Sequence, residues 1–519
     1  MSTPVGYTWL AQHFELETAA LSHRSYIGTR SRAELPNERI AYSVVEYFLQ
    51  TYYPDDHPLA HIEFALKYDD LNLDLLQQVF HKLSAGDVAS HIDKQPSGKY
   101  SRQIGYLYEF LTGRELMLAR PIGGNYVDLL NPTKYLTAPA TKNARWRIND
   151  NLLGTNAFCP MVRLTEDLRQ AMDQDYSGRL EAFKNKVPPE LFRRAIDYLY
   201  FKESKSSYDI ERETPTPERG ERFVEALKNA GRSPLDEVLS EASLTLLQNI
   251  IVEPRYAQEG YRTWQNHVGE SPPGRRPIIH YICPPGEDVA SLMKGLIDCA
   301  HKATYVHPIA RAAVISFGFV FIHPFEDGNG RIHRYLIHDF LSRDGLVPDG
   351  MILPVSAYML HNGREYDRTL EAYSKSIKQV VRYTINDDEV LAVTNRDAVI
   401  GSYRYPDLTP QVGYLFNAVE KTISIELIGE LLFIRNYDEA RKAIRAVVDL
   451  PDRKLDQIIK FLHQDNGRLS KAKRGYFVEI TDDEIRRIEE QYQEAFRANE
   501  SLDAFGNGHQ QNSTDGSAQ

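Results

Sequence analysis

A run of residues in the second half of the chain combines side chains that could carry out chemistry on a phosphate. Within residues 323–334 it holds two histidines, two carboxylates, two glycines and two arginines. A neutral imidazole can accept a proton near pH 7, and a carboxylate can hold a divalent cation. Glycines let backbone N–H groups approach an anion closely. The run therefore predicts a phosphate site that includes a general base.

Helices must position these groups on both sides of the run. An apolar helical pattern resumes at Ile332, and the start of a helix collects unpaired N–H donors and the positive end of the helix dipole. Phosphates are expected there. Pro324 disfavours the α region for the residue before it, which places His323 at the end of an earlier helix, expected over 308–322. We predict a base at the end of one helix and a phosphate nest at the start of the next.

The same run resembles the signature of the Fic family, His-x-Phe-x-(Asp/Glu)-Gly-Asn-Gly-Arg-x-x-Arg, at every specified position. The resemblance implies a helical enzyme that transfers AMP from ATP to a Ser, Thr or Tyr hydroxyl of a protein and releases pyrophosphate. It implies ATP as the substrate and Mg²⁺ as the metal, with Mn²⁺ as the alternative ion. The related Doc branch, which transfers phosphate, departs from Gly-Asn-Gly-Arg, whereas this chain keeps it.

The resemblance implies a role for each signature residue. His323 would be the general base, Asp327 the metal ligand and Arg334 the ligand of the γ-phosphate. The other nucleotide contacts within the run would be Phe325, Gly328, Asn329, Gly330 and Arg331. Tyr366, on a later helix, resembles the tyrosine that lines the adenine pocket. Ser374 stands where the family often has Asn, so the base of the nucleotide stays open.

An upstream segment, Ser-Ser-Tyr-Asp-Ile-Glu-Arg at 206–212, is similar to the inhibitory motif of the family, (Ser/Thr)-x-x-x-Glu-(Gly/Asn). Ser207 and Glu211 match it, and Arg212 does not. In the family this Glu pairs with the last arginine of the signature, here Arg334, and displaces the γ-phosphate. A desolvated pair of this kind competes with the substrate for the same guanidinium donors. The alternative is a surface run at the end of a helix.

A third segment predicts a short strand. Its residues alternate β-branched and aromatic side chains between prolines, and they are Ile278, Ile279, His280, Tyr281 and Ile282. In Fic enzymes the corresponding position carries a β-hairpin flap that pairs with the backbone of the target, so these residues would dock a protein substrate. A hairpin with a purely structural role is the alternative.

The chain of 519 residues suggests three or so domains. The expected fold class is mainly α, with a Fic-type helical bundle as the core and a short β-hairpin flap. The expected parts are a mainly helical accessory domain at 1–185, a Fic domain at 186–390 with the inhibitory segment near 207–211, a winged-helix-like module at 405–498 and a disordered tail at 499–519. Helices are expected over 39–52 and 71–83 in the accessory domain.

The winged-helix interpretation comes from two helices, a basic turn and a strand expected over 476–480. Such a module could bind nucleic acid through Arg468, Lys471, Lys473 and Arg474, and the chain would then be a DNA-binding regulator with a nucleotide-sensing Fic core. The net charge of −11 opposes a broad surface for a phosphate backbone. A solvated hairpin tip in a protein-docking or dimerising domain is therefore favoured.

We interpret the whole chain as a protein adenylyltransferase that Glu211 inhibits, with deAMPylation or another nucleotidyl transfer at the same site as alternatives. The expected partner is a protein with an acceptor hydroxyl, and self-AMPylation and a homodimer are further expectations. Three cysteines without metal-binding spacing suit a reducing compartment. The sequence shows neither a signal peptide nor an apolar span of 18 residues, so a cytoplasmic location without membrane contact is expected.

Overall fold

The computed structural model describes residues 2–19, 21–34, 44–270, 278–386 and 391–497, so the predicted disordered tail at 499–519 lies outside the described residues. The chain forms two compact units. The first comprises Met1–Gln174, Ser207–Leu346 and Met359–Asn417, and the second comprises Asp175–Ser206, Val347–Tyr358 and Ala418–Gln519. Three of the five unit boundaries fall inside helices, which are α8 (Pro189–Ile210), α15 (Val355–His361) and α18 (Thr409–Lys421). The domain boundaries expected from the sequence stay a prediction.

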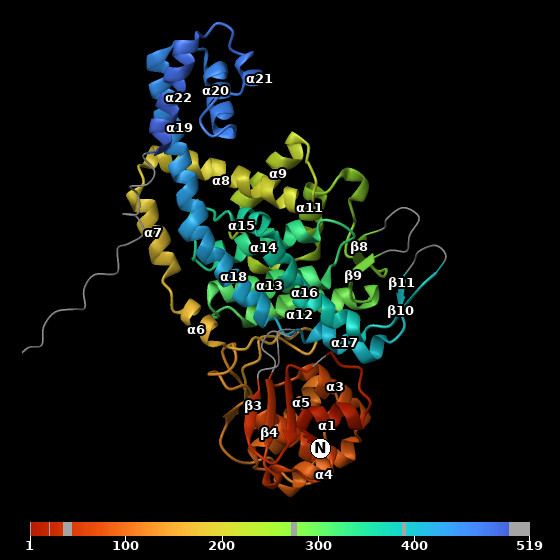
Figure 1. Ribbon diagram of the computed structural model, residues 1–519. Coiled ribbons are helices and arrows are strands. Elements are labelled where there is room, and N and C mark those ends of the chain that lie inside the picture. Colours follow the sequence, from red (N-terminus) through yellow and green to blue (C-terminus); the bar gives the residue numbers. More distant parts are fainter. Residues whose placement is uncertain (1, 20, 35–43, 271–277, 387–390, 498–519) are drawn as a thin grey trace, which may run out of the picture. The chain divides into compact units, whose positions relative to one another are not determined.

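The amino-terminal part of the first unit combines helices with two small sheets (Figure 1). One sheet has the order β1-β2-β4-β3, in which β2 and β4 are parallel and the other pairs antiparallel, and the second has the order β5-β7-β6. The strands are β1 (Thr3–Val5), β2 (His23–Ile27), β3 (Arg32–Glu34), β4 (Val44–Phe48), β5 (Val127–Asp128), β6 (Thr141–Asn143) and β7 (Ile148–Asp150). The helices are α1 (Gly6–His13), η1 (Gln50–Tyr52), α2 (Pro58–Tyr68), α3 (Leu73–Lys82), α4 (Ala85–Lys94), α5 (Lys99–Thr112) and α6 (Glu166–Met172). The prediction of a mainly helical region missed both sheets.

One predicted helix of this part is wrong. Of the range 39–52, the described residues form strand β4 and the 3-10 helix η1. Strand β4 is rich in β-branched and aromatic residues, and it pairs with β2 on one side and β3 on the other. This pairing with distant segments overrides the helical spacing of the apolar residues. The helix predicted over 71–83 is confirmed as α3.

The core of this part depends on a close approach between α5 and a tryptophan. Trp146 is fully buried in a cluster that includes Leu76, Ile104 and Leu107. A Cβ atom added to Gly105 would lie 2.0 Å from the Trp146 ring. Only glycine lets the helix backbone lie against the indole.

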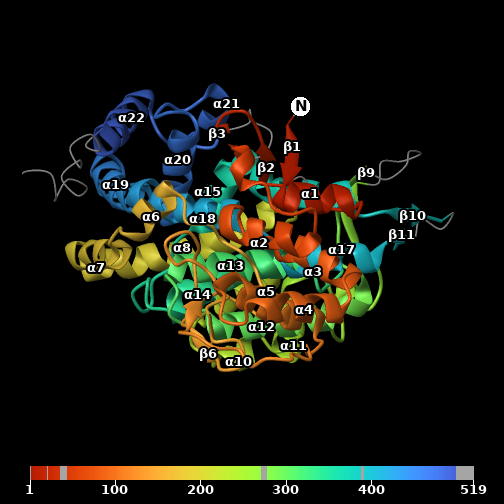
Figure 2. The same ribbon diagram turned by 90° about the horizontal axis from the view of Figure 1, so that it is seen from below.

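The remainder of the first unit is a group of helices around α13, which is buried along nearly its whole length. Figures 1 and 2 show α12 and α14 beside α13. The elements are α9 (Pro217–Lys228), α10 (Leu235–Val238), α11 (Glu241–Ile251), η2 (Pro254–Tyr256), β8 (His267–Glu270), β9 (Ile278–Ile282), α12 (Gly286–Lys302), α13 (Pro308–Ile322), α14 (Asn329–Arg343), α16 (Gly363–Val380), β10 (Tyr383–Ile385), β11 (Leu391–Val393) and α17 (Arg396–Arg404). Helix α13 matches its predicted range. Neither α13 nor any other helix in the described ranges is long and apolar enough to cross a membrane.

The carboxy-terminal part of the second unit is helical, and the predicted wing is wrong. Its elements are a π-helical turn (Thr422–Glu426), α19 (Leu427–Val447), α20 (Asp452–Gln464), α21 (Lys471–Arg474) and α22 (Asp482–Arg497). Helix α7 (Tyr176–Lys186) belongs to an earlier segment of the same unit. Residues 476–480 form turns. Phe477 and Ile480, three positions apart, are buried, whereas Tyr476 and Val478 are exposed. This spacing does not fit the alternation of a strand, and the described residues after Val393 offer no strand to pair with.

The basic turn also differs from the predicted hairpin tip. Lys473 donates to Asp465 at 2.8 Å, and Arg474 pairs with Asp482. Two of the four basic side chains proposed to meet nucleic acid are therefore paired with carboxylates of the same unit. Nothing in this arrangement favours the DNA-binding interpretation.

Candidate active site

His323 lies where α13 ends. Its backbone is left-handed (φ 54°, ψ 59°), and its N–H donates to the carbonyl of Phe319 at 2.9 Å. The predicted position of His323 at the end of a helix is thus confirmed, although its backbone is left-handed and not the extended form that a following proline favours. Nδ1 of His323 lies 3.1 Å from the carbonyl oxygen of Val320, which can only accept, so Nδ1 carries the proton. Nε2 is then the ring atom that can accept a proton from another group.

The surroundings of His323 keep its imidazole neutral. Burial, together with the positive charge of Arg262, lowers the pKa of the ring to about 4. Glu211 and Asp327 act in the opposite direction. At neutral pH the ring is in the form that a general base requires.

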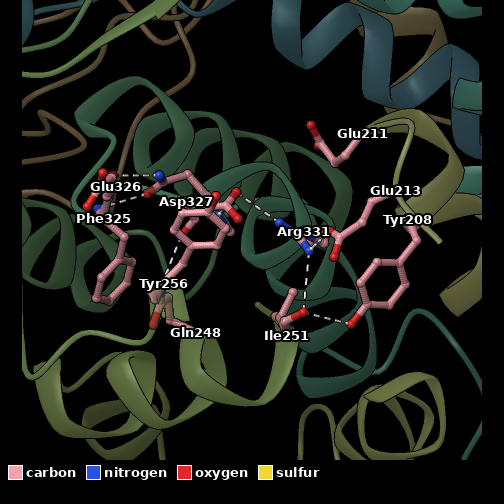
Figure 3. Close-up of polar contacts among 12 residues, drawn as sticks. Tyr208, Glu211, Glu213, Gln248, Ile251, Tyr256, Phe325, Glu326, Asp327 and Arg331 are labelled. Atoms are coloured by element: carbon pink, nitrogen blue, oxygen red, sulfur yellow. Dashed lines mark hydrogen bonds and ion pairs between the residues drawn. The ribbon is translucent and has the colours of Figure 1, made fainter. Parts of the chain in front are cut away.

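The loop after His323 is braced by its own side chains. Asn329 Oδ1 accepts from the backbone N–H of Phe325 at 3.0 Å, and Asn329 Nδ2 donates to the Phe325 carbonyl at 2.8 Å. The Phe325 ring is fully buried and meets Tyr261 edge-on at 5.6 Å between centroids. Gln248 Nε2 on α11 donates to the Asp327 carbonyl at 3.3 Å, and Figure 3 shows both residues. Phe325 and Asn329 therefore shape the loop, and their predicted contact with a nucleotide stays a prediction.

Asp327 and Arg331 face each other at the start of α14. Asp327 Oδ1 accepts from the N–H of Gly328 at 2.6 Å and from Arg331 Nη2 at 2.9 Å. Gly328 has a φ of 90°, which favours glycine at this turn into the helix. The guanidinium of Arg331 is buried, whereas 43% of the Asp327 side chain is exposed. Asp327, the predicted metal ligand, is thus accessible to solvent, whereas Arg331, a predicted phosphate ligand, is buried.

Arg334 lies one turn along α14 and contacts both predicted inhibitory residues. Its Nε donates to Ser207 Oγ at 2.8 Å, and its Nη2 donates to the Ser207 carbonyl at 2.7 Å and to Glu211 Oε1 at 2.8 Å. Arg334 is 1% exposed, and the Glu211 side chain is 38% exposed. A Cβ atom added to Gly330 would lie 2.2 Å from Glu211 Oε1. The carboxylate therefore lies directly against the start of α14, where the sequence predicts phosphates.

Glu213 completes this set of carboxylates, and the sequence analysis missed it. It forms an ion pair with Arg331 Nη1 and accepts from Arg219 Nη2 at 2.6 Å; Figure 3 shows it directed at Arg331. Arg212, between the two glutamates, has a left-handed φ of 57°. This turn sends both carboxylates towards α14. The acidic residue two positions after Glu211 was the available signal, but the left-handed turn at an arginine was not predictable.

The predicted flap forms a hairpin. Strand β9 covers the predicted residues 278–282 and pairs antiparallel with β8, with an irregularity between Val268 and Gly269. Along β9, Ile278 and His280 are exposed, whereas Ile279, Tyr281 and Ile282 are buried. The Tyr281 hydroxyl donates to the carbonyl of Phe321 at 2.5 Å, near the end of α13. The strand is thus tied to the helix that carries the candidate base, and its docking role stays a prediction.

Tyr366 on α16 is buried next to this site. Its ring stacks on that of His333, and Tyr414 lies 5.9 Å away between centroids. Burial raises the pKa of its hydroxyl to about 12, and the charge of Arg334 acts against this rise. Tyr366 therefore lies beside Arg334, which binds Glu211. A contact with adenine stays a prediction.

The comparisons with known proteins agree with the signature. Residues 238–341 match the Fic/DOC family, a range that contains the signature run and begins after Glu211. Protein adenylyltransferase Fic of Drosophila sechellia is 27% identical over 212 residues, which cover 37% of this chain and 42% of the relative. The protein of the same name from Nematostella vectensis is 28% identical over 222 residues, 38% of this chain and 51% of the relative. The chain thus spans about half, or less, of the length of these curated relatives.

Among solved structures, a Fic family protein from Desulfovibrio desulfuricans G20 is similar with a TM-score of 0.37 and 18% sequence identity, covering 60% of this chain and 87% of that one. A Fic-1 structure from C. elegans is similar with a TM-score of 0.32 and 20% identity, covering 50% of this chain and 72% of that one. The family assignment rests on the sequence match and the signature. This chain is a Fic/DOC family protein, distantly related to proteins named protein adenylyltransferase Fic.

Proposed function

We propose that the protein transfers AMP from ATP to a Ser, Thr or Tyr hydroxyl of a protein, and that Glu211 holds it in an inhibited state. The complete signature and the name of the relatives support the reaction class. The contact between Glu211 and Arg334 carries the proposal, because a carboxylate here takes the guanidinium that would bind the γ-phosphate. The protein would become active when this pair breaks.

In the proposed reaction His323 Nε2 accepts the proton of the acceptor hydroxyl. The hydroxyl oxygen forms a bond to the α-phosphorus of ATP, and the bond from that phosphorus to the bridging oxygen breaks, so that pyrophosphate leaves. Negative charge builds up on the phosphate oxygens during this step. The guanidinium groups of Arg331 and Arg334 and the N–H groups at the start of α14 would stabilise it. Catalysis would come mainly from positioning and from electrostatic stabilisation.

Asp327 fits a Mg²⁺ ion that the substrate helps to hold. Mg²⁺ in nucleotide sites usually takes one or two carboxylates together with phosphate oxygens and water. The Asp327 carboxylate is partly exposed, and no cluster of three or more His, Cys, Asp or Glu among the described residues could hold an ion on its own. The ion would reduce the negative charge of the phosphates when bound. Asp327 would supply one oxygen ligand and would then release Arg331.

Strand β9 would present the target to His323. Its exposed residues, Ile278 and His280, alternate with buried ones, and the Tyr281 hydroxyl fixes the strand to the end of α13. A peptide that pairs with such a strand is held mainly through its backbone, so little sequence specificity is required. This arrangement supports a protein as the acceptor of AMP.

The position of the label in ATP tests the reaction class. The Glu211→Gly variant should transfer label from ATP labelled at the α-phosphorus to proteins of a cell lysate. With ATP labelled at the γ-phosphorus, it should add no label beyond that which the lysate alone incorporates. Glu221→Gly, which alters an exposed residue of α9, controls for the effect of a glycine in a helix. Transfer of the γ-label would show phosphoryl transfer and would contradict the proposal.

Removal of AMP by the same site is a second candidate. Its support is the position of Glu211, whose carboxylate lies against Gly330 and could orient a water molecule. Wild-type protein should then release AMP from a modified target, whereas Glu211→Gly should not. Equal release by both proteins would exclude this role for Glu211.

A further inference from the structure

Arg262 is a buried arginine whose side chain binds only backbone carbonyls among the described residues. It lies in the segment between η2 and β8 and is 1% exposed. Nε donates to the carbonyl of His323 at 2.7 Å, and Nη2 donates to those of Ile322 at 3.3 Å and Pro284 at 2.9 Å. Nη1 donates to the carbonyl of Trp264 at 2.7 Å. The backbone N–H of Arg262 donates to the Pro324 carbonyl at 2.8 Å.

These contacts join two elements of the proposed active site. Ile322 and His323 carry carbonyls at the end of α13, which have no partner within the helix and lie at the negative end of its dipole. Pro284 lies two residues after β9. One guanidinium therefore fastens the base-bearing end of α13 and the exit of the flap strand to each other. A fork of fixed donors suits this task, and a lysine would satisfy fewer of the carbonyls.

Burial of this charge is costly because no carboxylate of the described residues pairs with it, and burial lowers the pKa of Arg262. The carbonyl oxygens offset part of the cost. The arrangement holds His323 in its left-handed conformation, which a non-glycine residue adopts only when its surroundings enforce it. A hydrogen bond from Arg262 to the carbonyl of that same residue supplies such enforcement.

We propose that Arg262 is a positioning residue for AMP transfer, which fixes the backbone of His323 relative to strand β9 so that a docked hydroxyl meets the base. The proposal rests on the adenylyltransferase function proposed above. Arg262 would act through His323 and the flap, and it has no part in binding the nucleotide. Its loss should slow the chemical step and leave the affinity for ATP close to that of the parent.

Arg262 also affects the protonation of His323. Among the charged groups that act on this ring, Arg262 favours the neutral form, whereas Glu211 and Asp327 favour the protonated form. A neutral side chain at position 262 should therefore raise the pKa of His323. As the pH falls, the rate of AMP transfer by the variant should therefore begin to decrease at a higher pH than the rate of the parent. A purely structural role would not move this pH dependence.

The test uses Arg262→Met and Arg262→Lys in the Glu211→Gly protein, with Arg255→Met as the control because Arg255 is exposed in the adjacent 3-10 helix η2. Arg262→Met should reduce kcat at least tenfold, keep the Kd for ATP within about twofold and shift the acidic limb of the pH profile upward. Arg262→Lys should reduce kcat, but the acidic limb of its pH profile should stay close to that of the parent. Arg255→Met should match the parent.

An unchanged kcat in Arg262→Met, or a pH profile that stays in place, would overturn the proposal. If the Glu211→Gly parent transfers no AMP, the proposed function fails, and the inference is tested on its own by nuclear magnetic resonance. Carbon-13 labelled histidines, with His323 assigned from a His323→Ala spectrum, report the pKa of the ring directly. A pKa that is higher in folded Arg262→Met than in its parent supports the coupling, and an equal pKa contradicts it.

An independent observation concerns Arg331. Its Nη1 binds Glu213 and, at 3.3 Å, the carbonyl of Ile251, and its Nη2 binds Asp327. Both terminal nitrogens of the guanidinium are thus in use. Glu213 also holds Arg219, which would keep a partner for the carboxylate after it left Arg331. The Glu213 side chain is 27% exposed, so solvent reaches it.

We infer that Glu213 is a second inhibitory carboxylate, which blocks Arg331 as Glu211 blocks Arg334. This inference also rests on the proposed function. Glu213→Gln should bind ATP with Mg²⁺ about tenfold more tightly than the wild type, and the double variant with Glu211→Gly should bind more tightly than either. Glu225→Gln, at an exposed position of α9, is the control.

Calorimetry of ATP binding separates the outcomes. Unchanged or weaker binding in Glu213→Gln, with tighter binding in Glu211→Gly, would refute the inhibitory role and show that Glu213 only positions Arg331. Absence of ATP binding in every variant, the double variant included, would instead refute the proposed function. Tighter binding of ATP in both single variants would support two separate inhibitory contacts at the site.

Discussion

Nη2 of Arg334 donates a hydrogen bond of 2.8 Å to Oε1 of Glu211, and that oxygen lies where any side chain on Gly330 would have to fit. The pair joins the turn after α8 to the start of α14. A phosphate that used Arg334 and the N–H groups of this helix start would need the space of the carboxylate. In this account, therefore, the pair and a bound triphosphate exclude each other.

Ser207 should stabilise the pair of Glu211 and Arg334. Its hydroxyl oxygen accepts from Nε of Arg334 at 2.8 Å in a buried position. Ser207→Ala removes that hydrogen bond, worth about 1 kcal/mol, so ATP should bind about fivefold more tightly. Calorimetry measures the change. In the Glu211→Gly background the same substitution should have little effect, and an equal gain in both backgrounds would show that Ser207 acts independently of Glu211.

Gly330 should be required for ATP binding as well as for the contact of Glu211 with α14. Its missing side chain is what allows Glu211 to approach α14, since a Cβ would lie 2.2 Å from Oε1. Gly330→Ala should therefore weaken ATP binding at least tenfold even in the Glu211→Gly background, because a phosphate needs the same close approach. Gly363→Ala, where nothing lies within 4 Å, is the matched control. Normal ATP affinity in Gly330→Ala would contradict a phosphate nest at this position.

Acid should destabilise the fold through its buried histidines. Burial lowers the pKa of His333 to about 3 and the pKa of His307 and His61 to about 4. The unfolded chain, with a histidine pKa near 6.5, binds more protons below that pH, so this stability is complete above about pH 6.5 and is lost as the pH falls towards 4. Asp69 and Asp74, with pKa values raised to about 6, act in the opposite direction.

A substitution isolates the contribution of His333, which packs against Phe317. His333→Phe cannot titrate. Its free energy of unfolding, measured with urea between pH 7 and pH 4.5, should fall by about 2 kcal/mol less than that of the wild type. Parallel pH curves for the two proteins would show that His333 does not resist protonation in the folded state.

Gly105 should control stability away from the active site. A Cβ there would lie 2.0 Å from the fully buried Trp146 ring. Gly105→Ala should lower the free energy of unfolding by about 1–3 kcal/mol, because the indole and the α5 backbone must move apart. Gly413→Ala, in helix α18 with nothing within 4 Å, should not destabilise the protein. Equal stability of the two variants in urea would refute this account of the packing.

Local sequence signals predicted helix α13, which ends at the base, and strand β9. Helix α13 has Pro308 at its first position and Pro324 shortly after its end, and strand β9 lies between prolines, so both were predictable. Strand β4 was not, because its neighbours β2 and β3 decide its conformation. Residues 476–480 were predicted as a strand, although the two buried apolar residues, Phe477 and Ile480, lie three positions apart.

The same distinction applies to the active site. The signature run and Glu211 were predictable because their residue types match a known motif. Glu213 reaches Arg331 only through the left-handed backbone of Arg212, and Arg262 reaches His323 from a segment 61 residues away. Neither contact leaves a pattern in a single sequence. Tertiary structure alone brings these groups together.

The central claim is that His323 performs AMP transfer at a site that Glu211 closes. The most direct measurement compares transfer of the α-label of ATP to lysate proteins by wild type, Glu211→Gly and Glu211→Gly with His323→Ala. We predict at least a tenfold rise in Glu211→Gly, and loss of transfer with retained ATP binding in the double variant. Equal transfer by wild type and Glu211→Gly, or transfer that persists without His323, would contradict the account.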